Sequence, residues 1–298
     1  MDSEELQKWR KAGKIAAQAL QYGKTLIKPG ASMREVCDKV DAKIIELGAR
    51  PAWPTQIGCN DVAAHFTPDP DDDTVFKDEL VCLDVGAHVD GYVGDNALTV
   101  DLSGKRGKFV DAAKHAMEAA AKLVKAGVSI SEISHIIQET IVNHGLQPVR
   151  NLSGHTISRW VIHDKPSVPN VEAKNLGVLK EGQVIAIEPF VTDGKGMIYE
   201  QDQANLFALV QKKPVRSPYA REILQFVEKE YHTLPFTTRW LSAKFGIGKV
   251  NLALRDLLQN GSLHSYAPLI EEASGMVAVH ENTLLVTKDG CEWLTKAD

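Results

Sequence analysis

Acidic residues interrupt some of the most apolar runs of this 298-residue chain. Asp84 lies within CLDVGA, Glu188 lies within VIAIEPF, and Glu281 begins a strand-like run that follows MVAVH. An ionised carboxylate that is buried without a partner is costly, so each of these side chains requires a cation, a network of donors or a proton. A purely structural protein has little reason to place acids in such positions.

Asp95 joins this set because it lies with Asp84 on the two arms of one predicted hairpin. Residues 80–83 lead into Asp84, the turn is predicted at 90–91, and 92–99 form the returning arm. Two carboxylates about 4 Å apart repel each other by roughly 4 kcal/mol at an effective dielectric constant of about 20. Divalent cations remove this repulsion, and no nearby run of Lys or Arg is available to do so.

Each residue also has an ordinary structural interpretation. Asp95 can be a turn or edge residue, Glu188 before Pro189 can face solvent, and His155 in NLSGHTI can be a hydrogen-bonded core histidine. If the side chains converge, four carboxylates and one imidazole suit Mn, Fe, Co or Zn rather than a structural zinc site of the cysteine type. Two such ions bridged by carboxylates generate hydroxide at neutral pH and stabilise a tetrahedral intermediate. The residue types alone leave both interpretations open.

Composition indicates an ordinary globular protein, with 44% hydrophobic and 24% charged residues. The net charge of −5 argues against a chain-wide nucleic-acid surface, although a local basic patch remains compatible with it. The charged N-terminus has no apolar signal region, and no stretch approaches the roughly 20 apolar residues of a membrane span. Four scattered cysteines without a C-x-x-C pair favour reduced thiols. We therefore expect a cytoplasmic protein without a membrane partner.

Hydrophobic periodicity predicts a strand-rich core that a small helical module interrupts. The expected elements of the core are helices at 4–23, 32–47, 105–126 and 131–144, extended segments at 50–58 and 184–190, and a polar loop at 65–73. After about residue 205 the composition shifts, and residues 211–250 hold eight Lys or Arg against three Glu. Helical patterns at 220–231 and 249–258 fall in or beside this basic stretch, and strand character returns at 274–287.

Five motifs, taken in order, resemble the type II methionine aminopeptidases, and the short N-terminus is similar to the archaeal form of that family. They are AHFTP (64–68), LDVGAHVDGYVGDNALT (83–99), NLSGHTI (151–157), IAIEPF (185–190) and VHENTLLVT (279–287). The resemblance implies an α+β pita-bread fold, of the creatinase/aminopeptidase-like kind. It also implies that 1–204 and 267–298 form the catalytic domain and that 205–266 form a helical, winged-helix-like insertion.

The resemblance further implies a dinuclear site with two divalent ions per chain, of Co, Mn, Fe or Zn. Asp84 matches the bidentate ligand of one ion, and Asp95 and Glu281 match the bridging pair. His155 and Glu188 match the ligands that complete the second ion. All five ligand positions of the family are therefore retained.

Four more residues are implied at the substrate side of this site. His65 matches a histidine near the substrate amine and the scissile bond, and His163 matches one that hydrogen-bonds the substrate carbonyl. Trp53 and Ile162 fall where the family lines its methionine pocket, with Trp53 at a position where Phe is expected. Glu188 is expected to take a proton from the attacking water. The implied activity is removal of the first methionine from nascent polypeptides with a small second residue, by a monomer.

Two other functions are compatible with parts of the pattern. Aminopeptidases and dipeptidases specific for Xaa-Pro bonds share the fold and a similar ligand set, but they usually carry a large N-terminal domain, and only 83 residues precede Asp84 here. Non-catalytic paralogues that bind RNA or ribosomes have lost ligands, whereas this chain retains all five. The basic insertion could still contact ribosomal RNA while the enzyme is active, and such a contact would weaken steeply with salt.

Overall fold

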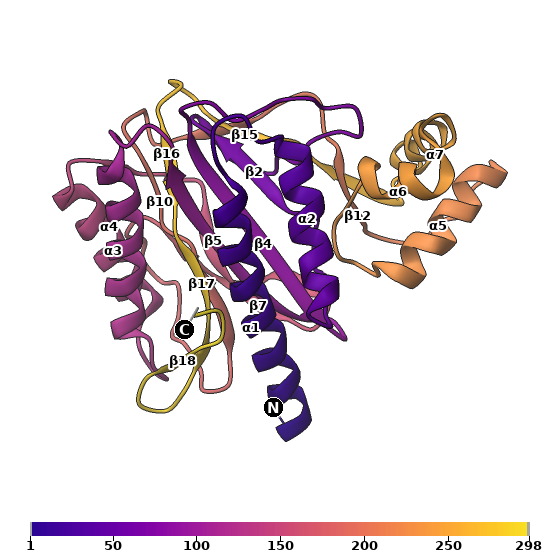
Figure 1. Ribbon diagram of the computed structural model, residues 1–298. Helices are drawn as coiled ribbons and strands as arrows, with labels where there is room; N and C mark the ends of the chain where they lie inside the picture. Colours follow the sequence, from indigo (N-terminus) through magenta and orange to yellow (C-terminus); the bar gives the residue numbers. More distant parts are fainter. Residues whose placement is uncertain (1, 297–298) are drawn as a thin grey trace.

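The computed structural model describes residues 2–296, and its centre is a nine-stranded sheet in the order β1-β4-β5-β17-β9-β7-β8, with β2 on β4 and β18 on β17 (Figure 1). The pairings within this sheet are antiparallel. Its strands are β1 (Arg50–Pro51), β2 (Gln56–Cys59), β4 (Leu80–Val89), β5 (Tyr92–Asp101), β7 (Ser153–Ser158), β8 (Val161–Pro169), β9 (Val184–Ile187), β17 (Glu281–Val286) and β18 (Cys291–Trp293). The predicted hairpin is confirmed as β4 and β5, which turn between Val89 and Tyr92.

Two pairs of helices pack on this sheet: α1 (Ser3–Leu26) with α2 (Met33–Glu46), and α3 (Gly107–Leu123) with α4 (Ile130–Asn143). Figure 1 shows α1 and α2 in front of β4 and β5, with α3 and α4 beside them. Ser32 caps α2 by accepting a hydrogen bond from the Glu35 backbone at 3.3 Å, and Ser129 caps α4. Each pair of helices buries its own apolar core against the sheet. No helix within residues 2–296 is long and apolar enough to cross a membrane.

The apolar run at 184–190 forms two strands rather than the single one predicted. It ends as β9 at Ile187 and resumes as β10 (Phe190–Thr192) in a different sheet, which places Glu188 at the crossing. Pro189 explains the break, because its nitrogen has no hydrogen to donate to a ladder. The predicted strand run at 274–287 also splits between two sheets, into β16 (Val277–Val279) beside β10 and β17 in the central sheet. The third strand of the sheet that holds β10 and β16 is β6 (Gln147–Pro148). A further small sheet consists of β11 (Ile198–Glu200), β15 (Leu269–Glu271) and β3 (Val62–Ala64).

A helical module with its own small sheet lies at one end of the molecule, drawn in orange in Figure 1. Its strands and helices are β12 (Leu206–Leu209), α5 (Pro218–Glu230), β13 (Phe236–Thr237), α6 (Thr238–Phe245), α7 (Ile247–Gln259) and β14 (Leu263–Tyr266). These elements enclose a separate apolar cluster that includes Phe207, Phe236 and Leu257. The helical patterns predicted α5 and α7 and missed α6. The winged-helix-like domain assignment of 205–266 stays a prediction.

Candidate metal centre

Strand register brings the predicted acids onto one face of the sheet. Ala97 of β5 pairs with Asp84 on one side and with Glu281 on the other, so these three residues form a row across three strands. Residues directly opposite each other in an antiparallel pair share a face, as do residues two apart along one strand. Asp95 therefore lies on the same face, one step along β5, opposite Gly86. Ala97 carries only a methyl group, which leaves space above the sheet for the carboxylates, and the Trp53 indole packs over Gly86.

A neighbouring row brings in the imidazole. Ala186 of β9 pairs with His155 on β7 and with Thr283 on β17. Thr283 is joined to Asp95 through its hydroxyl, which accepts from the Asp95 backbone N–H at 2.9 Å and donates to the Asp95 carbonyl at 2.8 Å. Glu188 lies two residues beyond Ala186, where β9 has just ended. The five predicted ligands thus reach one place from five separate segments.

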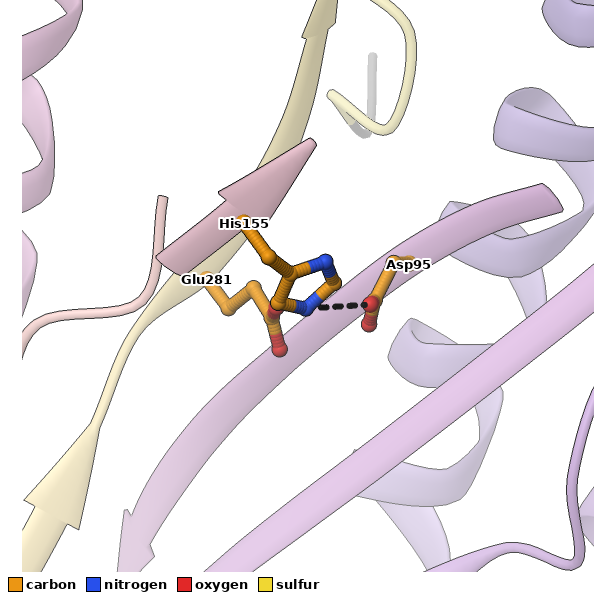
Figure 2. A group of neighbouring side chains, drawn as sticks. All are labelled: Asp95, His155 and Glu281. Carbon is orange, nitrogen blue, oxygen red and sulfur yellow. Dashed lines mark ion pairs between the residues drawn. The ribbon is translucent and has the colours of Figure 1, made fainter. Parts of the chain in front are cut away.

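The side chains themselves converge and are buried. His155 Nε2 lies 3.6 Å from Asp95 Oδ2 and 3.8 Å from Glu188 Oε1. One ligand atom each from Asp95, His155 and Glu281 lie within 4.8 Å of one another. Figure 2 shows these three side chains pointing toward a common centre. Asp84 faces the same cavity, which all five residues line.

The electrostatics of this cluster fit divalent cations. Burial raises the pKa of Asp84 to about 7. Burial and the neighbouring carboxylates raise the pKa values of Asp95, Glu188 and Glu281 well above their ordinary range. Burial also lowers the pKa of His155 to about 3, so its imidazole is neutral and its nitrogen can act as a ligand. Four acids that resist ionisation together, beside a neutral imidazole, form a donor set that two hard or borderline dications would satisfy.

The predicted substrate residues line the same cavity, which has a volume of about 330 Å³. Trp53 Nε1–H donates to Asp84 Oδ1 at 3.2 Å, and the ring of His163 stands edge-on to that of His155 with centroids 4.6 Å apart. Ile162 lies beside His163 in the cavity wall. All nine residues singled out in the sequence therefore meet here.

His65 occupies a conformation that its surroundings must hold in place. Its φ angle is +62°, in the left-handed region that non-glycine residues seldom adopt, and its backbone N–H donates to Gln56 Oε1 at 2.7 Å. Burial, and secondarily the nearby His163, lower the pKa of His65 to about 4. Burial lowers the pKa of His163 as well. Both imidazoles are neutral at pH 7, and each can donate one hydrogen bond.

Sequence reasoning missed one wall of the cavity. Leu206, Pro235, His264 and Tyr266 line it, and all four come from the helical module. Tyr266 stands edge-on to His65 with ring centroids 5.5 Å apart. None of these residues belongs to a motif, so periodicity could identify their strands but not their place beside the metal-binding cluster.

Comparison with known proteins agrees with this geometry. The model of metallopeptidase family M24 matches residues 7–288. A methionine aminopeptidase of Methanothermobacter thermautotrophicus is 41% identical over 98% of this chain and 99% of its own length. One from Archaeoglobus fulgidus is 43% identical over 99% of this chain and 100% of its own length.

A solved structure supports the predicted pita-bread fold. Methionine aminopeptidase from Thermotoga maritima superposes with a TM-score of 0.74 at 25% identity, covering 100% of this chain and 98% of that one. The α+β prediction is confirmed by the antiparallel sheet and its flanking helices. Because the family model spans most of the chain and the relatives match it over their full length, this chain belongs to metallopeptidase family M24.

Proposed function

We propose that this chain is a dinuclear-metal aminopeptidase that hydrolyses the N-terminal methionine from polypeptides. The observation that carries the proposal is the convergence of four buried carboxylates and one neutral imidazole at one cavity, in a chain whose full-length relatives are methionine aminopeptidases. The cavity is large enough for one unbranched side chain and its terminal amine.

The five converging residues would hold two divalent ions. Asp84 would bind one ion, Asp95 and Glu281 would bridge the pair, and His155 and Glu188 would complete the second. When bound, such ions polarise a carbonyl and lower the pKa of a coordinated water. Glu188 lies at the break between β9 and β10, and in this role its carboxylate takes the proton of the attacking water.

The neutral histidines would orient the peptide. His163 donates a hydrogen bond to the substrate carbonyl, where charge develops during attack. His65 lines the same cavity, edge-on to Tyr266, and would orient the terminal residue near the scissile bond. Trp53 and Ile162 form the apolar wall against which the methionine side chain packs. By its resemblance to the methionine aminopeptidases, the chain would accept a small second residue.

Peptide hydrolysis tests this proposal against the Xaa-Pro alternative. Purified protein loaded with Mn²⁺ or Co²⁺ is expected to release methionine from Met-Ala-Ser and to leave an Ala-Pro peptide intact. An Asp84→Ala variant is expected to lose both turnover and metal binding. Cleavage of the Xaa-Pro peptide alone, or near-normal activity of the variant, would overturn the assignment.

The partner of this site is then the N-terminus of a nascent polypeptide. A contact between the basic insertion and the ribosome stays a prediction. The structure reduces the number of basic side chains that are free to make this contact. Lys212 and Lys249 pair with Glu228 and Glu222, and Arg239 is buried. Three of the eight basic side chains counted in 211–250 thus form ion pairs with carboxylates within the molecule.

A salt series can decide whether the rest of the patch binds ribosomes. Arg216 is exposed on the surface of the module and Lys213 is half-buried beside it. Binding through this patch should fall steeply as salt rises, and it should weaken when both residues are changed to Gln. Ribosome binding that ignores both salt and the double substitution would contradict a role for the patch.

A further inference from the structure

The helical module is joined to the core by a buried ionic contact at the start of α6. Arg239 is only 7% exposed and pairs with Asp38 and Asp41 of α2, its Nη2 lying 3.7 Å from Asp41 Oδ2. Trp240 Nε1–H donates to the same Oδ2 atom at 2.9 Å. One oxygen of Asp41 is therefore held entirely by the module.

The other oxygen of Asp41 binds Thr55, which is next to a residue of the cavity wall, Gln56. Asp41 Oδ1 accepts from the Thr55 backbone N–H at 3.0 Å and from the Thr55 hydroxyl at 2.6 Å. The Thr55 carbonyl accepts from the Thr67 hydroxyl at 2.9 Å, and that hydroxyl in turn accepts from Arg239 Nη2 at 3.1 Å. Hydrogen bonds thus join Asp41 to Thr55, Thr55 to Thr67 and Thr67 to Arg239, and the Arg239–Asp41 ion pair closes a ring that we call the Asp41 ring.

Thr55 lies between two residues that line the cavity, Trp53 and Gln56. Trp53 donates to Asp84, and Gln56 accepts from the backbone of His65. The left-handed conformation of His65 is strained for a residue with a side chain and persists only where neighbouring groups hold it. A small shift of Thr55 would therefore reach both Trp53 and, through Gln56, His65.

Stabilisation of the folded protein alone does not explain why this ring contains buried charges. The desolvation of a buried ion pair offsets most of its attraction, so apolar residues of similar shape would join the module to the core about as well. What a buried, fully bonded polar network adds is one defined geometry. In this network, the Thr55 backbone is the part that the hydrogen bonds hold in place, through its N–H and its carbonyl.

We propose that Arg239 and Trp240 are positioning residues, which act through Asp41 and Thr55 to fix Trp53 and His65 in the cavity wall. The helical module then sets the geometry of substrate binding even though its helices lie outside the metal-binding cluster. The kinetic consequence rests on the proposed aminopeptidase function. The structural consequence, restrained motion at Thr55 and His65, does not depend on that function.

The test uses Trp240→Phe, which keeps an aromatic ring against Tyr231 and removes the donor to Asp41. Lys249→Gln is the matched control, because it breaks a surface pair with Glu222 in the same module. Amide hydrogen exchange of the full-length protein should be about tenfold faster at Thr55 and His65 in Trp240→Phe, with β9 unchanged. In Lys249→Gln, exchange at Thr55 and His65 should match that of the original protein.

Steady-state kinetics give a second readout. Trp240→Phe should raise the KM for Met-Ala-Ser by about tenfold while kcat changes by less than about twofold. Thr55→Val removes the hydroxyl from the other side of Asp41, and the double variant should be no worse than the more affected single variant, because both act through one ring.

The outcomes separate the two proposals. Unchanged exchange at Thr55 and His65 would overturn the positioning role, as would an equal acceleration at every amide, which would indicate a contact that only stabilises. Additive effects of Trp240→Phe and Thr55→Val would also overturn it. If the original protein released no methionine, the proposed function would fail, while the exchange data would still decide the role of the ring.

Discussion

The hydrogen bond between Trp53 and Asp84 links the cavity wall to the metal-binding cluster, and Trp53→Phe isolates it. The substitution removes the Nε1 donor, which lies 3.2 Å from Asp84 Oδ1, and leaves an apolar aromatic ring in the wall. The indole also packs closely over the backbone of Gly86, where a Cβ atom would lie 2.4 Å from its ring. Trp53 therefore both fills space and orients a carboxylate.

The magnitude follows from the geometry of this bond. A donor–acceptor distance of 3.2 Å is at the long end of the range for N–H···O bonds. Hydrogen bonds to charged groups contribute about 1.5–3 kcal/mol. Because the Trp53–Asp84 bond is long, we assign it the low end of this range, about 1.5 kcal/mol. That energy corresponds to about tenfold in an equilibrium constant. Because the donor stabilises the ionised carboxylate that a metal ion requires, we expect the affinity for Mn²⁺ to fall by about tenfold.

Calorimetric titration of the metal-free protein with Mn²⁺ measures this affinity directly. Trp9→Phe is the control, since Trp9 is buried in the same apolar cluster, and the substitution makes the same change in ring size while leaving the donor to Asp84 in place. The reasoning is refuted if Trp53→Phe binds Mn²⁺ as tightly as the original protein. It is also refuted if Trp9→Phe weakens binding equally.

Three further predictions concern the acids and one histidine. Asp95→Asn mimics a protonated acid among repelling carboxylates, so it should raise the Tm of the metal-free protein by about 2 °C. The same variant should lose the increase in Tm that Mn²⁺ causes in the original protein. A Mn²⁺-dependent increase in Tm equal to that of the original protein, measured by scanning calorimetry, would contradict this. Burial alone raises the pKa of Glu271, but backbone N–H donors, that of Gly275 first, outweigh burial and hold it below its usual value. Glu271→Gln should therefore lower the free energy of unfolding by about 2 kcal/mol at pH 7. The difference in unfolding free energy between the variant and the original protein should narrow as the pH falls below about 4.5. Urea unfolding that gave the same difference above and below this pH would refute the prediction. His163→Gln should lower kcat about 100-fold with metal affinity unchanged, and steady-state kinetics with an unaltered kcat would remove His163 from catalysis.

Local signals were sufficient for several elements. Ser32 and Ser129 cap α2 and α4, and such caps depend on local sequence because an N-cap bonds to a backbone group within three residues. The β4–β5 hairpin follows from the apolar run at 80–83 and the turn at Asp90-Gly91, whose φ angles of +52° and +85° suit this pair of residues.

Other features depend on partners that are distant in the chain. Pro189 lacks a backbone donor, which explains why the strand predicted at 184–190 breaks there, but the transfer of β10 to another sheet depends on its pairing with Val277–Val279. Strands β12 and β14 pair across the whole helical module, and this pairing brings Leu206 and Tyr266 to the cavity. Periodicity within one segment contains no information about such pairings.

By itself, the sequence determined the chemistry that is available: acids placed in apolar runs, one imidazole among them, and a composition that lets both be buried. Only the tertiary structure decided that these groups meet. Asp84 and Glu281 share the partner Ala97, and Thr283 binds the Asp95 backbone from a strand 188 residues further along the chain. The physical reason is that cross-strand register sets which side chains lie together, and register is chosen by the burial of whole faces of the sheet rather than by any one segment.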